Sequence, residues 1–229
     1  MAITTTTLTR AAGLAAITGG LLFIAVQVKH PLLDAAFTTT TTEYTVRESM
    51  KIFMAVLSLI GITGIYLRQV KQTGVLGLIG YVVLAVGYLA IYSVQVIGVF
   101  VLPDLAAHQP GYVNDVLAVA TSSTPVGDVG RFQALSHGGF AYIIGGIIFG
   151  IALFRANILA RWAALLLSLG AVATIVTAHL PELTQRLFAI PVGIALIGLG
   201  YSLWREQRAA TAPAATGTGN SPLDPAEAR

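Results

Sequence analysis

The chain has 229 residues, of which 55% are hydrophobic, only 10% are charged and none is cysteine. Soluble domains are typically about 25% charged, so this chain lacks the polar surface that a protein needs in water. Without cysteine, disulfides, thiol catalysis, Fe–S clusters and Cys-ligated zinc are excluded. The formal net charge of +3 is small, and no nucleic-acid partner is expected. We therefore expect an integral membrane protein whose main partner is the lipid bilayer.

Apolar runs occupy residues 11–28, 52–67, 75–102, 138–154, 162–180 and 187–204. A membrane-spanning helix needs roughly 20 residues. The second and fourth runs are shorter than this, so the polar residues before them must enter the membrane boundary. The third run has 28 residues, about 42 Å as a helix, and must tilt or protrude. The six runs predict an all-α, polytopic fold of about six transmembrane helices.

The second, fourth and sixth runs end alike, with a glycine followed by apolar residues and an arginine, over residues 64–68, 150–155 and 200–205. This pattern suggests three helical hairpins of common plan, although helices that leave the membrane on the cytoplasmic side often end this way. We assign residues 1–206 to the transmembrane domain. Residues 207–229 are rich in Ala, Thr, Gly and Pro and are predicted to form a disordered cytoplasmic tail.

Local sequence patterns predict the start of the second transmembrane helix, one short helix in a loop and one site of close helix packing. Thr42 or Thr45 can cap the second transmembrane helix, and Glu48 lies three residues after Thr45, as in a capping box. In the loop after the third helix, residues 111–121 are predicted to form a short amphipathic helix. Gly146 and Gly150 form a close-packing motif that fits packing within the chain as well as between copies.

The distribution of charge indicates the orientation. With the N-terminus inside, eight of the Lys and Arg residues fall on the cytoplasmic side and five outside, whereas seven of the ten acidic residues fall outside. An excess of Lys and Arg marks cytoplasmic loops. We therefore expect a multi-pass plasma-membrane protein with both termini cytoplasmic. The outer side then receives all four histidines, which are His30, His108, His137 and His179.

Polar and ionisable residues gather at the predicted outer boundary. Such groups are costly at membrane depth and are usually paired or functional. The candidates for proton transfer are Glu48, His137, His179 and Glu182, and the candidates for ligand binding in the same cluster are Lys51, Gln133 and Arg186. The structural alternative is that Lys51 and Arg186 extend to the lipid headgroups, with Glu182 and Arg186 forming an i,i+4 pair.

Three further candidates lie on one face of the third helix. Tyr88, Tyr92 and Gln95 follow Tyr81 at helical spacing. They are candidates for lining a pocket for a lipid, isoprenoid or quinone, and interhelical packing is the alternative. No metal site is predicted, because two histidines on separate helices lack a third ligand. Haem held by His137 and His179 is an alternative, and no cofactor is assigned.

The run over residues 145–161, continuing as FRANILARW at 154–162, and the TRAAG sequence at 9–13 carry a loose resemblance. They are similar to uncharacterised small multi-pass membrane proteins of high-GC Gram-positive bacteria, catalogued as domains of unknown function. The resemblance implies a bacterial plasma-membrane location. The family has no known activity, so no catalytic residue is transferred.

Three functional hypotheses follow from these patterns. The first is a transporter or accessory subunit with an outward-facing pocket for a lipid, isoprenoid or other small molecule. The second is an intramembrane enzyme that acts on an isoprenoid or lipid by acid–base chemistry. The third is a structural subunit of a membrane complex.

Overall fold

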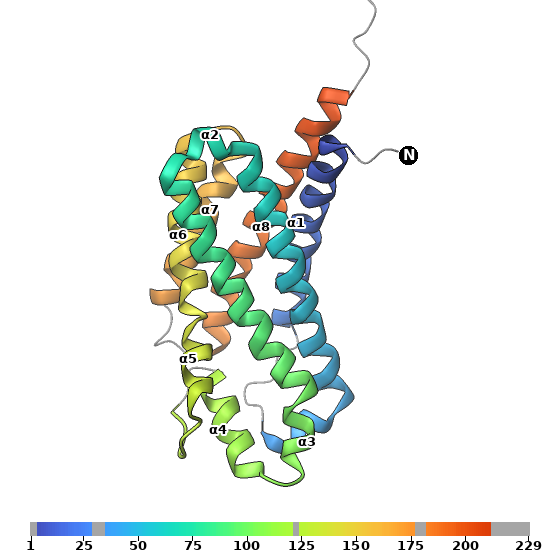
Figure 1. The fold of residues 1–229 in the computed structure, drawn as a ribbon, viewed down its shortest axis with the longest axis vertical. Coiled ribbons are helices and arrows are strands. Elements are labelled where there is room, and N and C mark those ends of the chain that lie inside the picture. The colour runs from blue at the N-terminus through green and yellow to red at the C-terminus, as the bar shows by residue number, and fades with distance from the viewer. Residues whose placement is uncertain (1–3, 29–34, 121–123, 177–181, 212–229) are drawn as a thin grey trace, which may run out of the picture.

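The computed structural model describes residues 4–28, 35–120, 124–176 and 182–211, and every element in these ranges is helical (Figure 1). The elements are α1 (Thr5–Val28), η1 (Ala36–Thr40), α2 (Thr42–Phe100), α3 (Leu102–Ala106), α4 (Pro110–Ala120), α5 (Arg131–His137), α6 (Phe140–Ala156), α7 (Arg161–Val176) and α8 (Glu182–Thr211). The prediction of an all-α fold is confirmed for the described residues.

Three helical stretches in these ranges are long and apolar enough to cross a membrane, namely Thr5–Gln27, Thr42–Phe100 and Arg131–Ala156. A shorter apolar helix covers Arg161–Ile175. The third stretch includes α5 and α6, so the polar residues of α5 do extend the short apolar run that follows them. Similarly, α2 begins ten residues before the second apolar run, and it carries Glu48 and Lys51 in its first turns.

The longest helix, α2, consists of two arms. Gly74 interrupts it with φ 57° and ψ −151°, a backbone conformation that glycine reaches without steric cost. The chain reverses there, so the first arm (42–73) and the second arm (75–100) lie side by side (Figure 1). Tyr66 on the first arm stacks on Tyr81 on the second, with ring centroids 4.6 Å apart. The Tyr81 hydroxyl also forms a 3.0 Å hydrogen bond with Thr63 Oγ1.

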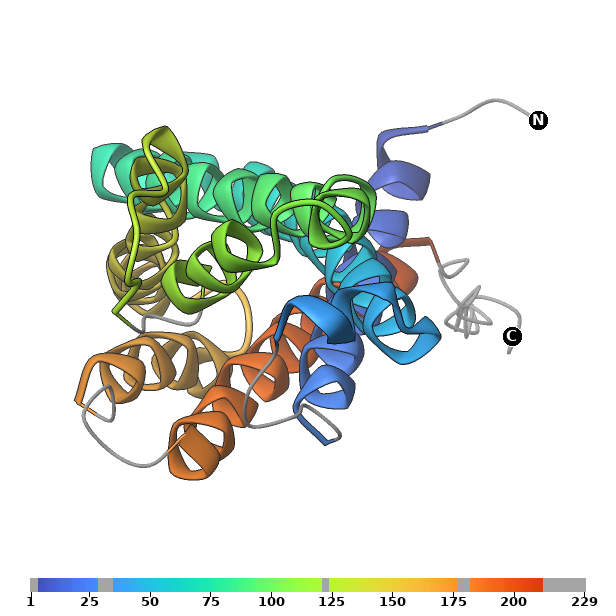
Figure 2. The same cartoon turned by 90° about the horizontal axis from the view of Figure 1, so that it is seen from below.

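The long helices form a closed ring. The first arm of α2 packs on α1, the second arm packs on α6, and the order continues through α7 and α8 back to α1 (Figure 2). Small residues permit close approach at each contact, as is usual between membrane helices. The pairs are Gly61 with Ala16, Gly87 with Tyr142, Gly150 with Ser168, Gly170 with Val192, and Gly200 with Gly13. The Gly146 and Gly150 motif therefore packs within the chain, against α7.

The two ends of the ring differ. At the end that holds Gly74, Arg68 on α2 forms a two-contact ion pair with Glu206 on α8. The opposite end carries η1, α3, α4 and α5, which we call the cap. A separate apolar cluster supports the cap, formed by Ala36, Tyr44, Leu102, Val113, Val116, Leu117, Val119 and Val129. The loop helix expected over residues 111–121 is α4, and its buried valines face this cluster.

Two boundaries differ from the sequence-based expectations. The N-cap of α2 is Thr41 rather than Thr42 or Thr45, because the Thr41 side chain accepts a hydrogen bond from the backbone N–H of Tyr44. In addition, α8 continues to Thr211, so the first five residues of the predicted tail are helical. The remainder of that tail, residues 212–229, lies outside the described residues.

Candidate functional site

A cavity of about 430 Å³ lies between the ring and the cap, and we call it the main cavity. The second arm of α2, α6 and α7 form its walls on the ring side, and α4 and α5 close it on the cap side. Its lining residues are Ala90, Ile91, Val94, Gln95, Val119, Ala120, Pro125, Gln133, Ser136, His137, Gly139, Phe140, Tyr142, Ile143 and Thr174. The volume falls within the range typical of small-molecule sites, about 300–1,000 Å³.

Gln133 and His137 line the main cavity. Both side chains are exposed, and both come from α5, which Gly130 precedes and Gly138 and Gly139 follow. Gly138 and Gly139 keep right-handed helical backbone angles, so α5 and α6 form one helical stretch, Arg131–Ala156. The His137 ring lies 5.9 Å from that of Phe140.

A second, smaller cavity of about 110 Å³ lies beside the main cavity. It is lined by Tyr44, Glu48, Lys51, Val94, Gln95, Gly98, Leu102, Val116, Leu117, Ala120 and Phe132. Gln95, Val94 and Ala120 belong to the linings of both cavities. The half-buried Gln95 therefore stands at the partition between them.

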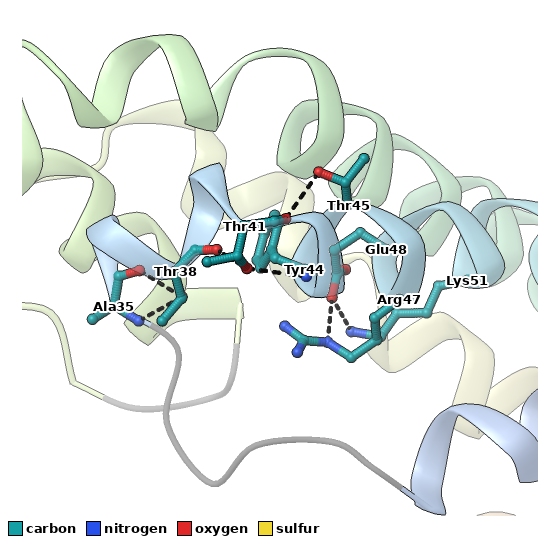
Figure 3. A network of polar contacts seen from close by, with 8 residues as sticks. All are labelled: Ala35, Thr38, Thr41, Tyr44, Thr45, Arg47, Glu48 and Lys51. Carbon is teal, nitrogen blue, oxygen red and sulfur yellow. Dashed lines mark hydrogen bonds and ion pairs between the residues drawn. The ribbon is translucent and has the colours of Figure 1, made fainter.

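A buried ionic cluster borders the smaller cavity, and two of its members, Glu48 and Lys51, line that cavity. Glu48 Oε1 accepts hydrogen bonds from Arg47 Nε at 3.1 Å and from Lys51 Nζ at 2.7 Å (Figure 3). Glu48 is 4% exposed and Arg47 is 8% exposed. A buried carboxylate needs such partners, because an unpaired buried charge is strongly unfavourable. Both hydrogen bonds of Glu48 Oε1 are therefore made to residues of its own helix.

The four residues on the shared face of the second arm of α2, which are Tyr81, Tyr88, Tyr92 and Gln95, lie in different environments. Tyr81 pairs with the first arm of α2, as described above. Tyr88 is 1% exposed and packs edge-on against Tyr142, with ring centroids 5.3 Å apart. Tyr92 is 37% exposed and lies outside both linings, whereas Gln95 contributes to both. Of the three candidates on this face, Tyr88, Tyr92 and Gln95, only Gln95 therefore lines these cavities.

The remaining candidates cannot be placed against the cavities. His179 lies outside the described residues, and Glu182 and Arg186 belong to a stretch of α8 that is described by its backbone alone. The haem alternative, which required His179, therefore stays a prediction. Within the described ranges, no group of three or more His, Asp or Glu residues is arranged to hold a metal ion.

Sequence reasoning missed several residues of the main cavity. Tyr142 and Thr174 contribute to its walls, and Ala120 and Pro125 contribute from the cap. The sequence feature that could have indicated them is the Gly138-Gly139 pair beside His137, where backbone can approach closely. The cap residues carried no signal, because their position depends on how α4 folds back over the ring.

Comparison with known proteins gave no relative: no protein-family model, curated protein or solved structure matches this chain.

Proposed function

We propose that this chain is a six-pass membrane protein that binds a lipid, an isoprenoid or another small amphiphilic molecule in the main cavity. In this proposal it acts as a transporter or as an accessory subunit. The observation that carries it is the cavity of about 430 Å³ between the ring and the cap, whose lining combines apolar side chains with Gln95, Gln133 and His137. Sites for small amphiphilic molecules typically combine apolar walls with a few polar groups that fix orientation.

The number of membrane crossings is inferred from the two arms of α2. Its 59 residues would measure about 88 Å as a straight helix, far more than the roughly 30 Å of a bilayer core. Reversal at Gly74 makes each arm one crossing. With α1, α6, α7 and α8 in the same ring, the proposed total is six.

The orientation is inferred from the charge at the two ends of the ring. Among residues with described side chains, the Gly74 end holds six basic residues (Arg10, Arg68, Lys71, Arg155, Arg161 and Arg205) and one acid, Glu206. The capped end holds five acids and three basic residues, namely Glu43, Glu48, Asp104, Asp115, Asp128, Arg47, Lys51 and Arg131. The positive-inside rule therefore favours a cytoplasmic Gly74 end and an outward-facing cap. A bacterial plasma membrane is the location that the sequence resemblance implies.

The two other hypotheses have less support. An intramembrane enzyme needs a proton donor and acceptor at one substrate. However, Glu48 is paired with two cations and lines the smaller cavity, whereas His137 lines the main cavity. A structural subunit does not require a cavity of this size.

The test is an inventory, by mass spectrometry, of the lipids and small molecules that co-purify with the detergent-solubilised protein. Ile143→Trp fills the main cavity, because Ile143 lines it. Ile144→Trp is the matched control, because Ile144 is 51% exposed and lies outside that lining. We expect one compound to be enriched with the wild type and with Ile144→Trp, and to be lost from Ile143→Trp. The same inventory from all three proteins would remove the support for a ligand in this cavity.

A further inference from the structure

Some polar side chains that line the main cavity form hydrogen bonds with other residues of the protein, and others do not. Ser136 Oγ donates to the backbone oxygen of Val119 at 3.2 Å, which ties α5 to α4. Thr174 Oγ1 donates to the backbone oxygen of Gly170 at 3.0 Å. Both hydroxyl protons are therefore used within the protein.

Gln95, Gln133 and His137 have their polar atoms available. Within the described part of the chain, no side-chain hydrogen bond joins any of the three to another residue. The two amides come from opposite walls, since Gln95 is on α2 and Gln133 is on α5. Each amide offers two N–H donors and one carbonyl acceptor, and the imidazole adds a third polar group.

This donor and acceptor set matches an uncharged head group. A hydroxyl or a carbonyl oxygen pairs well with an amide, which can donate and accept at once. A phosphate or diphosphate is instead held by Arg or Lys in charge-assisted hydrogen bonds. Among the described lining residues of the two cavities, Lys51 is the one Lys or Arg, and its Nζ lies 2.7 Å from Glu48 Oε1.

We propose that the main cavity selects an uncharged amphiphile, such as an isoprenoid alcohol or a prenylated quinone. Gln95 and Gln133 bind the hydroxyl or carbonyl oxygens of its head group. The apolar tail lies against Ile91, Val94 and Ile143. This inference rests on the proposed function, because it names the ligand class of the same cavity.

The experiment measures binding of three radiolabelled probes to the full chain in lipid nanodiscs. Geranylgeraniol carries a hydroxyl, a geranylgeranyl-substituted benzoquinone carries carbonyls, and geranylgeranyl phosphate carries an anionic head, so all three probes share one tail. The proteins are the wild type, Gln95→Leu, the cavity-filled Ile143→Trp and the control Gln109→Leu. Gln109 is exposed and lies outside both cavity linings.

We expect the alcohol or the quinone to bind the wild type at least tenfold more tightly than the phosphate does. Gln95→Leu should weaken binding of that neutral probe about fivefold, the factor that one net hydrogen bond supplies. Gln109→Leu should leave binding unchanged, and Ile143→Trp should abolish it. Which neutral probe binds more tightly distinguishes a hydroxyl head from a carbonyl head.

Two results would overturn the inference in different ways. Tighter binding of the phosphate, still abolished by Ile143→Trp, would reject the uncharged head group and leave the proposed cavity function intact. Equal retention of all three probes by wild type and Ile143→Trp would reject the neutral-ligand site and the proposed function together.

Discussion

At the scale of single residues, the buried hydroxyl groups fall into two kinds. The Tyr81 hydroxyl joins the two arms of α2 through Thr63. By contrast, the Tyr142 hydroxyl is buried and has no hydrogen-bond partner in the described part of the chain. Leaving a buried polar group unsatisfied is costly, whereas a satisfied one contributes a modest net stabilisation. The two tyrosines should therefore respond oppositely to loss of the hydroxyl.

Tyr81→Phe should lower the free energy of unfolding by about 0.5–1 kcal/mol, because it removes an interhelical hydrogen bond inside the bundle. Tyr142→Phe should leave that free energy unchanged or raise it, because it removes an unpaired group. Unfolding in mixed micelles, followed by circular dichroism, measures both. A larger loss for Tyr142→Phe than for Tyr81→Phe would show that the Tyr142 hydroxyl has a partner, such as a bound water.

At the scale of helices, contact between the second arm of α2 and α6 depends on the absence of side chains. A Cβ added to Gly145 would lie 2.2 Å from the backbone nitrogen of Leu84. One added to Gly87 would lie 2.2 Å from the backbone nitrogen of Tyr142. Backbone atoms cannot rotate away as a side chain can. The two helices, which together hold one wall of the main cavity, would have to separate.

Gly145→Ala should therefore destabilise the protein by about 1–3 kcal/mol, the usual cost of overpacking a close contact. Gly111→Ala is the matched control, since a Cβ at Gly111 meets nothing within 4 Å. On α4 the added methyl group should be neutral or slightly stabilising, through a gain in helix propensity of at most about 1 kcal/mol. Thermal unfolding in detergent measures both variants. Similar unfolding temperatures for the two would mean that the α2–α6 contact relaxes easily.

At the scale of the whole molecule, the two ends of the ring should face different compartments. The chain has no cysteine, so a single introduced cysteine reports its own location without background. Val126 near the cap is fully exposed, and Gln72 beside the Gly74 reversal is also exposed. These positions test the proposed orientation directly.

In intact cells, a membrane-impermeant maleimide should label Val126→Cys. It should label Gln72→Cys only after the membrane is permeabilised, because the charge distribution places the Gly74 end inside. The reverse pattern would invert the proposed orientation. Labelling of both positions in intact cells would contradict a membrane crossing between the Gly74 end and the cap.

Local sequence patterns predict the helical class, which the described residues confirm, and the positions of the apolar segments. Both properties depend on local hydrophobicity along the chain. No pattern singled out Gly74 as the residue at which α2 reverses, although glycine adopts its positive φ without steric cost. The positions of Glu48, Lys51, Gln95, Gln133 and His137 beside apolar runs also made them candidates. Polar groups at membrane depth are costly and are usually paired or functional.

Which of these residues line the same cavity depends on the tertiary structure. It placed Glu48 and Lys51 in one cavity, Gln133 and His137 in another, and Gln95 between them. It also kept Tyr92 away from both linings and brought Tyr142 and Thr174 to the main cavity. Helical spacing fixes the face on which a residue lies, but the neighbour on that face depends on contacts between segments far apart in the chain. The fold of the cap over the ring is such a contact, and no local pattern encodes it.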